Sequence, residues 1–230
     1  MSIKLGLIML GVFLLAGLSP PLMAQENLAQ ILVEKGMAKI IKLDIRKITR
    51  IDIENTTEKY DKEGTKKSGK TEHKTTDARL EVRGISMEEL YQAFQTRYDF
   101  YIDMNESTAV INDVTYAVVK FGPKPNLTIK KTADQLINRS EGSIYINLDN
   151  FDIVKIHGFI KDPFDFIFYW KFIPLAHINV YQFEFTVEYT TFNNMTVEQS
   201  VGGIADYDTT IQGRGMEKFT NKISNYRMKN

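Results

Sequence analysis

The stretch that decides the fold runs from Pro163 to Thr190 and reads PFDFIFYWKFIPLAHINVYQFEFTVEYT. Large apolar residues occupy alternate positions in two runs separated by Pro174. Alternate side chains of a strand point to opposite faces of a sheet, so each run predicts a strand with one aromatic face. Only the second run predicts a wet opposite face, because Ile167 and Tyr169 lie between the aromatic residues of the first. The apolar positions are Phe164, Phe166, Phe168, Trp170 and Phe172 in the first run, and Tyr181, Phe183, Phe185, Val187 and Tyr189 in the second.

An aromatic face of this width must be covered by a helix, another sheet or a bound apolar ligand. A covering helix is predicted at Met87, because Ser86 and Glu89 have the spacing of a capping box and apolar residues follow at helical spacing through Phe94. Two interpretations stay open: the face is ordinary core, or it lines a concave apolar pocket for an acyl chain or another apolar ligand. In the second interpretation the lining residues are Phe164, Phe166, Phe168, Trp170, Phe172, Tyr181, Phe183 and Phe185, and the lid residues are Met87, Leu90 and Phe94.

The rest of the pattern predicts one α+β domain of mostly antiparallel strands. A short amphipathic helix is expected from Glu26 to Met37, with Leu28, Ile31 and Leu32 on its apolar side. Apolar and charged residues then alternate from Ile41 to Glu54, with Ile48 as an exception to the pattern. This alternation predicts a strand with one wet face, which is typical of an antiparallel sheet.

The segment from Asn55 to Asp77 is almost wholly polar, and Gly64 and Gly69 are its expected turn points. It is either a solvated hairpin or a charged docking arm, and its mixed charges favour the solvated hairpin. Further strands are expected along the second half of the chain, interrupted by a short helix that a second capping box opens at Thr132. The pair Gly202-Gly203 predicts a turn or a bulge among the last strands.

Composition and motifs argue against most catalytic and nucleic-acid functions. Lys and Arg together number 29, as do Asp and Glu, so the basic excess typical of nucleic-acid binding is absent. His73, His157 and His177 lack metal-ligand spacing, and there is no cysteine, phosphate-binding glycine loop or Gly-x-Ser-x-Gly turn. Asp162 and Asp165 flank a proline, which favours a loop over an acid–base pair. We therefore expect no cofactor, no metal, no nucleic acid and no enzymatic activity.

The N terminus predicts a secretory signal peptide over residues 1–24. Lys4 precedes an apolar run of about 14 residues, which is shorter than the roughly 20 that a membrane-spanning helix needs, and Ala24 offers a cleavage position. An uncleaved anchor is the alternative. Cleavage would leave residues 25–230 as a single domain without a transmembrane segment. An exported chain without cysteines fits a periplasmic or secreted bacterial protein.

Three short motifs resemble a known family. They are FGPKP at Phe121–Pro125, GSIYIN at Gly142–Asn147 and DIVKIHG at Asp152–Gly158. They are similar to those of exported bacterial proteins related to the outer-membrane lipoprotein-sorting (LolA-like) superfamily, where Trp is common at the place of Tyr145 and Asp at the place of Asn147. The resemblance covers roughly Leu80 to the C terminus. It implies a curved antiparallel half-barrel whose open face is covered by short helices, and in the lipoprotein carriers that apolar face takes up acyl chains.

Three functions remain to be separated. The first is a non-enzymatic exported protein that binds a lipid, an acyl chain or a lipidated partner in an apolar half-barrel, with helix movement as the gate. The second is a protein-interaction or envelope-structural module with a fully packed core, which meets its partner through a sheet edge or the charged hairpin. The third is a hydrolase with a dispersed site. A cavity behind the aromatic face separates the first from the second, and clustered acid–base groups would favour the third.

Overall fold

The computed structural model describes residues 22–41, 48–76, 81–82, 85–170, 173–193, 195–211 and 213–228. Its helices are α2 (Leu22–Ile41), α3 (Met87–Thr96), α4 (Thr132–Ile137) and the single 3₁₀ turn η1 (Met104–Glu106). Its strands are β1 (Ile48–Tyr60), β2 (Lys66–Thr76), β3 (Glu81–Val82), β4 (Ile85–Ser86), β5 (Tyr98–Tyr101), β6 (Thr108–Ile111), β7 (Val114–Pro123), β8 (Ser140–Ile146), β9 (Ile153–Ile160), β10 (Phe164–Trp170), β11 (Ile173–Phe192), β12 (Met195–Thr209) and β13 (Gly213–Met228).

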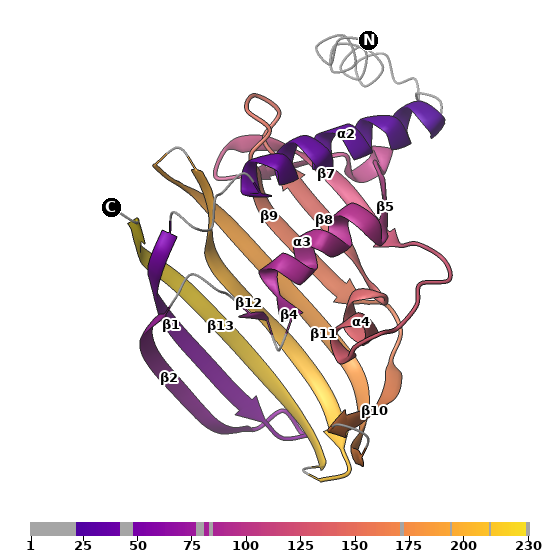
Figure 1. The fold of residues 1–230 in the computed structure, drawn as a ribbon, viewed down its shortest axis with the longest axis vertical. Coiled ribbons are helices and arrows are strands. Elements are labelled where there is room, and N and C mark those ends of the chain that lie inside the picture. Colours follow the sequence, from indigo (N-terminus) through magenta and orange to yellow (C-terminus); the bar gives the residue numbers. More distant parts are fainter. Residues whose placement is uncertain are drawn as a thin grey trace.

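Within the described residues, eleven strands pair in one antiparallel sheet of order β2-β1-β13-β12-β11-β9-β8-β7-β5 (Figure 1). Strand β10 pairs with β11, β6 pairs with β7, and β3 and β4 form a separate two-stranded sheet. The first long strand, β1, lies beside the last, β13, while β2 and β5 end the path, so the sheet is not closed. The predicted α+β fold of mostly antiparallel strands is confirmed at this level.

Strands β9 and β10 both pair with the same edge of β11. Strand β10 pairs with the beginning of β11, from Ile173 to Val180, and β9 pairs further along, from Glu184 to Glu188. The break between them contains Pro163, which has no amide hydrogen to donate to a ladder. The predicted aromatic stretch therefore forms two paired strands that belong to one continuous sheet.

The helices α2, α3 and α4 lie on one face of the sheet, which we call the inner face (Figure 1). Helix α2 buries the side chains that recur at helical spacing along one side, including Leu32, Val33 and Met37. Its last turns are fixed to the β8–β9 turn, where Lys39 Nζ lies 2.7 Å from an oxygen of Asp152. None of the described helices is long and apolar enough to cross a membrane.

The first helix and the strand after it differ from the prediction. Helix α2 extends to Ile41, so that residue is helical and not part of a strand, and the expected strand residues 42–47 lie outside the described part of the chain. Ile31 is exposed rather than on the apolar side. Irregularities in the pairing of β1 with β13 between Ile48 and Asp52 explain why Ile48 broke the alternation and is nevertheless buried.

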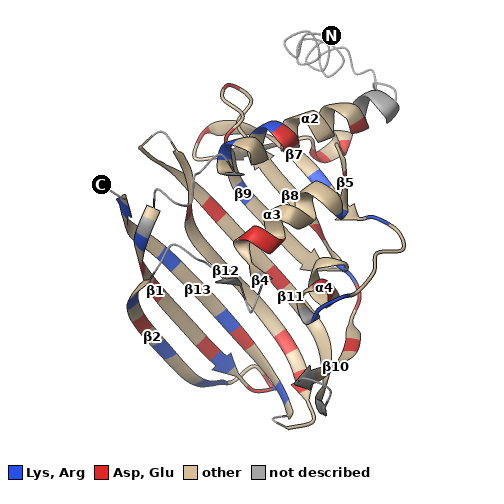
Figure 2. Ribbon diagram, in the orientation of Figure 1, with Lys and Arg blue, Asp and Glu red and all other residues tan. Residues whose placement is uncertain are grey.

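The polar segment forms the predicted solvated hairpin of β1 and β2. Gly64 lies in its turn with a φ of 81°, but Gly69 lies inside β2 and is not a turn point. Basic and acidic bands alternate over β1, β2 and β13 (Figure 2). Strand β2 is exposed over almost its whole length, so it adds little to the core, whereas β1 contributes the buried Ile51 and Ile53.

Two further local predictions are corrected. Gly202 and Gly203 lie inside β12, and Gly203 is required because a Cβ there would come within 2.1 Å of the carbonyl oxygen of Glu184. Helix α4 begins at Thr132, the residue expected as its cap, and the cap position is Lys131, one residue earlier. The carboxylate of Asp134 accepts hydrogen bonds from the amides of Lys130 and Lys131.

Candidate ligand-binding site

The second aromatic run forms the covered face, which we define as Phe183, Phe185, Val187 and Tyr189 of β11. All four side chains are buried, and the residues between them, such as Glu184 and Glu188, are on the other face. Gly158 on the neighbouring strand β9 makes room for the Phe185 ring. A Cβ at Gly158 would lie 2.4 Å from Phe185 Cε1, so the ring packs directly on the β9 backbone. Gly158 is thus a strand residue that shapes the site and does not form a turn.

Helix α3 covers this face, as the prediction of a covering helix at Met87 expected. The capping box is formed: the amide of Glu89 donates to Ser86 Oγ at 3.1 Å, and the amide of Ser86 donates to Glu89 Oε2 at 2.9 Å. Met87, Leu90 and Phe94 are buried, while the opposite side of α3 is exposed. The predicted lid residues therefore all point toward the core.

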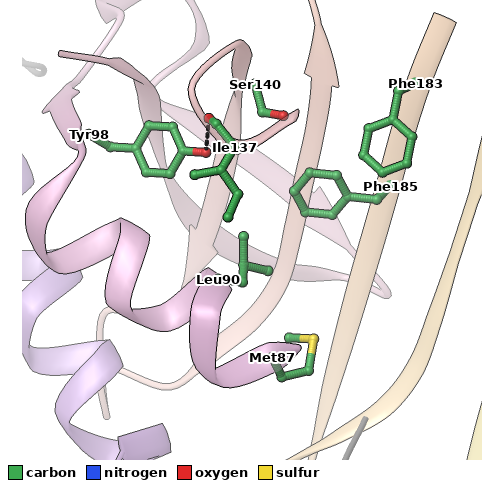
Figure 3. A pocket seen from close by; sticks show the side chains of 7 residues that line it. All are labelled: Met87, Leu90, Tyr98, Ile137, Ser140, Phe183 and Phe185. Carbon is green, nitrogen blue, oxygen red and sulfur yellow. Dashed lines mark hydrogen bonds between the residues drawn. The ribbon is translucent and has the colours of Figure 1, made fainter. Parts of the chain in front are cut away.

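A small cavity lies between α3 and the covered face (Figure 3). Its volume is about 10 Å³, enough for roughly one water molecule and far too small for an acyl chain. The hydroxyl of Ser140 donates to the carbonyl of Leu136 at 2.8 Å, and that of Tyr98 donates to the carbonyl of Ile137 at 2.6 Å, so neither has a hydrogen left to donate to water. The lining residues are Met87, Leu90, Tyr98, Ile137, Ser140, Phe183 and Phe185.

A buried polar cluster fastens α3 to the sheet. Tyr91 Oη lies 3.2 Å from Tyr189 Oη and donates to Glu198 Oε1 at 2.5 Å. A β-bulge between Glu188 and Tyr189 places Glu198 opposite Tyr189, which brings its carboxylate to the inner face. Burial raises the pKa of both phenols well above the usual range of tyrosine. The next largest cause is the charge of Tyr189 for Tyr91 and the charge of Glu198 for Tyr189. Both phenols therefore remain protonated and can donate hydrogen bonds.

Ionic contacts hold the two ends of α3. At its start, Glu89 pairs with Lys131 of the segment that leads into α4, and this contact lowers the pKa of the Glu89 carboxyl. At its end, Arg97 lies 2.9 Å from the buried Asp134 and donates to Asn138 Oδ1 at 2.7 Å. Helix α3 is therefore held in place by the burial of its apolar side, by the tyrosine cluster and by the ionic contacts at its two ends.

The first aromatic run forms what we call the rim patch: Phe164, Phe166 and Phe168 of β10 and Ile178 of β11. Phe164 is paired with Val180 and Phe166 with Ile178, which places the patch on the same face of the sheet as Val180 and Phe183. The rings of Phe164 and Phe166 stack with centroids 5.9 Å apart, and Phe168 is 37% exposed. The apolar face thus continues beyond α3 into a part that is only half buried.

One predicted lining residue does not join this face, and two others lie outside the described structure. A β-bulge between Val180 and Gln182 turns Tyr181 away, and its ring lies 4.2 Å beneath Arg214, which pairs with Asp206. The alternation alone could not reveal that bulge. The side chain of Trp170 lies outside the described structure, as does the whole of Phe172.

A second hollow, which sequence reasoning missed, lies between α2, α3 and β5. Its volume is about 320 Å³. Of its apolar lining residues, Val33, Met37, Phe94 and Phe100 are at most 5% exposed, whereas Ala38 is exposed. The hollow leaves space on the side of α3 that faces α2. Its lining residues are Gln30, Val33, Glu34, Met37, Ala38, Phe94, Gln95 and Phe100.

The ionisable side chains show no clustered reactive site in the described part of the chain. No three His, Asp or Glu side chains there are grouped so that they could hold a metal ion. His157 contacts Thr186 at 3.2 Å, and burial lowers its pKa. His177 lies 2.9 Å from Asp165 at an exposed position. His157 Nδ1 also lies 3.9 Å from Glu184 Oε1.

Comparison with known proteins finds no matching family model, no similar curated protein and no similar solved structure. The site must therefore be interpreted from its own geometry.

Proposed function

We propose that this protein is a non-enzymatic, exported bacterial protein that binds an acyl chain, as a free lipid or on a lipidated partner, between α3 and the inner face of the sheet. The observation that carries the proposal is the continuous apolar face that runs from the covered face, beneath α3, to the half-exposed rim patch. In this proposal the open antiparallel sheet, with its helices on one face, is the curved half-barrel of the LolA-like proteins that the sequence motifs resemble.

Binding requires α3 to move, because the cavity of about 10 Å³ holds no chain. Burial of a methylene group contributes about 0.8 kcal/mol, so about ten methylenes would contribute about 8 kcal/mol. Breaking the hydrogen bonds of Tyr91 would cost about 1–3 kcal/mol. This gain exceeds the cost of the Tyr91 hydrogen bonds alone, and it must also offset the apolar contacts of Met87, Leu90 and Phe94 that a moving α3 gives up. The hollow between α2 and α3 gives the helix space to shift.

The alternative is an interaction module with a permanently closed core. It is favoured by β2, an exposed edge strand of 11 residues whose outer backbone groups are free to pair with another strand. Four lysines on this strand would discourage indiscriminate pairing. In this alternative the protein binds no lipid, which separates it from the first proposal.

Native mass spectrometry with lipid extraction, on protein purified gently from the bacterial envelope, tests the proposal. We expect a co-purifying lipid that is lost on Phe168→Asp, which places a charge in the rim patch at a position that tolerates exposure. Val110→Asp is the matched control, because Val110 is also apolar and exposed but lies on β6. A lipid-free mass, with no binding of fluorescent fatty-acid probes, would favour the interaction module.

A further inference from the structure

A basic side chain stands at the edge of the rim patch. The guanidinium carbon of Arg139 lies 4.4 Å from the centroid of the Phe164 ring. Arg139 Nη1 donates to the backbone oxygen of Gln135 at 3.0 Å and to its Oε1 at 2.9 Å. These contacts hold the guanidinium plane against the apolar patch, and they use only one of its three nitrogens.

Arg139 lacks the counter-ion that comparable arginines have. Among the described residues, Arg97 pairs with Asp134 and Arg214 with Asp206, whereas no carboxylate pairs with Arg139. Lys161 adds a second cation nearby, because the ladder partners Ser140 and Ile160 directly adjoin Arg139 and Lys161. Asp162 follows Lys161 in the chain and carries the opposite charge.

We propose that Arg139 binds the carboxylate of a long-chain fatty acid whose alkyl chain lies on the rim patch. This inference rests on the proposed function and names its ligand as an anionic amphiphile with one chain. A guanidinium offers a planar pair of donors that matches a carboxylate, and it can stay stacked on an aromatic ring while it donates. The ligand that this arrangement fits has its charge at the edge of the sheet and its chain directed toward Phe183.

The test compares three ligands of one chain length on the full protein by isothermal titration calorimetry, below the micelle concentrations of the two ionic ligands and below the solubility limit of the neutral one. Lauric acid carries a carboxylate, dodecanol is neutral and dodecyltrimethylammonium is cationic. Because Arg139 is only half buried, we expect a moderate preference, with lauric acid binding about tenfold more tightly than dodecanol. The cationic ligand should bind most weakly.

Variants then assign the preference to one residue. Arg139→Gln should remove the advantage of lauric acid and leave dodecanol binding unchanged, while Arg139→Lys should keep part of it. Arg214→Gln is the matched control, since Arg214 also lies over an aromatic ring but already has a carboxylate partner. Thermal unfolding of each variant reports whether it is folded.

The outcomes separate this inference from the function beneath it. Equal binding of lauric acid and dodecanol by the unaltered protein would overturn the role of Arg139 and leave acyl-chain binding standing. The role of Arg139 would also be overturned if folded Arg139→Gln still bound lauric acid more tightly than dodecanol by the same factor as the unaltered protein. If none of the three ligands binds, the proposed function fails, and the inference fails with it.

Discussion

The covered face and the rim patch are built from the same kinds of residue on one sheet, yet they differ in burial. Phe183 and Phe185 are at most 5% exposed beneath α3, whereas Phe168 is 37% exposed in a part of the sheet that none of the described helices covers. This difference shows that the alternation of residue types predicts which side chains share a face of the sheet. Whether a helix buries that face depends on contacts between segments that are far apart in the sequence. The predictions that follow test whether the two regions behave as differently as their burial implies.

Alkaline pH should have the largest effect, because it acts on the whole covered region. Burial raises the pKa of Tyr91 and Tyr189, so the folded protein holds protons that the unfolded chain would release. The stability that these phenols contribute is fully present below about pH 10, the pKa of an unfolded tyrosine, and is lost as the pH rises beyond it. Phenolate absorbance and circular dichroism should therefore show these phenols ionising only as the sheet unfolds. Ionisation of all 11 tyrosines without any change in circular dichroism would contradict the burial.

Phe185→Ala should be the most destabilising single change. It would leave a cavity in the covered face and lower the free energy of unfolding by about 3–5 kcal/mol. Phe168→Ala in the rim patch should cost about 1 kcal/mol or less, since that ring already contacts water. Urea denaturation of both variants measures the contrast, and equal losses would mean that the two regions are not different environments.

Gly158→Ala should lower the free energy of unfolding by about 1–3 kcal/mol, because the added methyl group would overlap the Phe185 ring. Gly122→Ala is the control within β7, where no atom lies within 4 Å of the new Cβ. We expect the control to be neutral or slightly stabilising. Thermal unfolding distinguishes the two, and a harmless Gly158→Ala would show that Phe185 does not pack on β9.

Tyr91→Phe should have the smallest effect on stability, about 1 kcal/mol, because it removes the hydroxyl that joins α3 to Tyr189 and Glu198. The same change should strengthen the binding of acyl probes severalfold, since the closed lid is what a ligand must displace. Tyr101→Phe is the control at an exposed position. Weaker or unaltered probe binding in folded Tyr91→Phe would mean that the cluster does not govern access.

Local patterns predicted much of the fold and part of the site. Alternation placed Phe183 and Phe185 on one face, and the spacing of Ser86 and Glu89 placed the start of α3, because both signals lie within a few residues. The bulge that turns Tyr181 away was not predictable, since it depends on the register against β12. The length of α2 was also missed.

The polar contacts of the site were beyond the reach of sequence patterns. Tyr91 contacts Glu198 across 107 residues of sequence, and neither side chain belongs to a recognisable motif. Arg139 lies on the ring of Phe164, although Arg139 belongs to the connection between α4 and β8 and Phe164 to β10. Such contacts arise only once the sheet has brought distant segments together. The hydrogen bonds that join α3 to Tyr189 and Glu198 were therefore visible only in the structure.

The most direct measurement of the central claim is methyl NMR with a spin-labelled fatty acid. If an acyl chain binds between α3 and the sheet, its label should broaden the methyl signals of Met87 and Leu90, which line the cavity, together with that of Ile178 in the rim patch. Val110 and Ile211, which are more exposed, should stay sharp. Broadening confined to such exposed residues, or none at all, would contradict the claim and show that the lid covers an ordinary packed core.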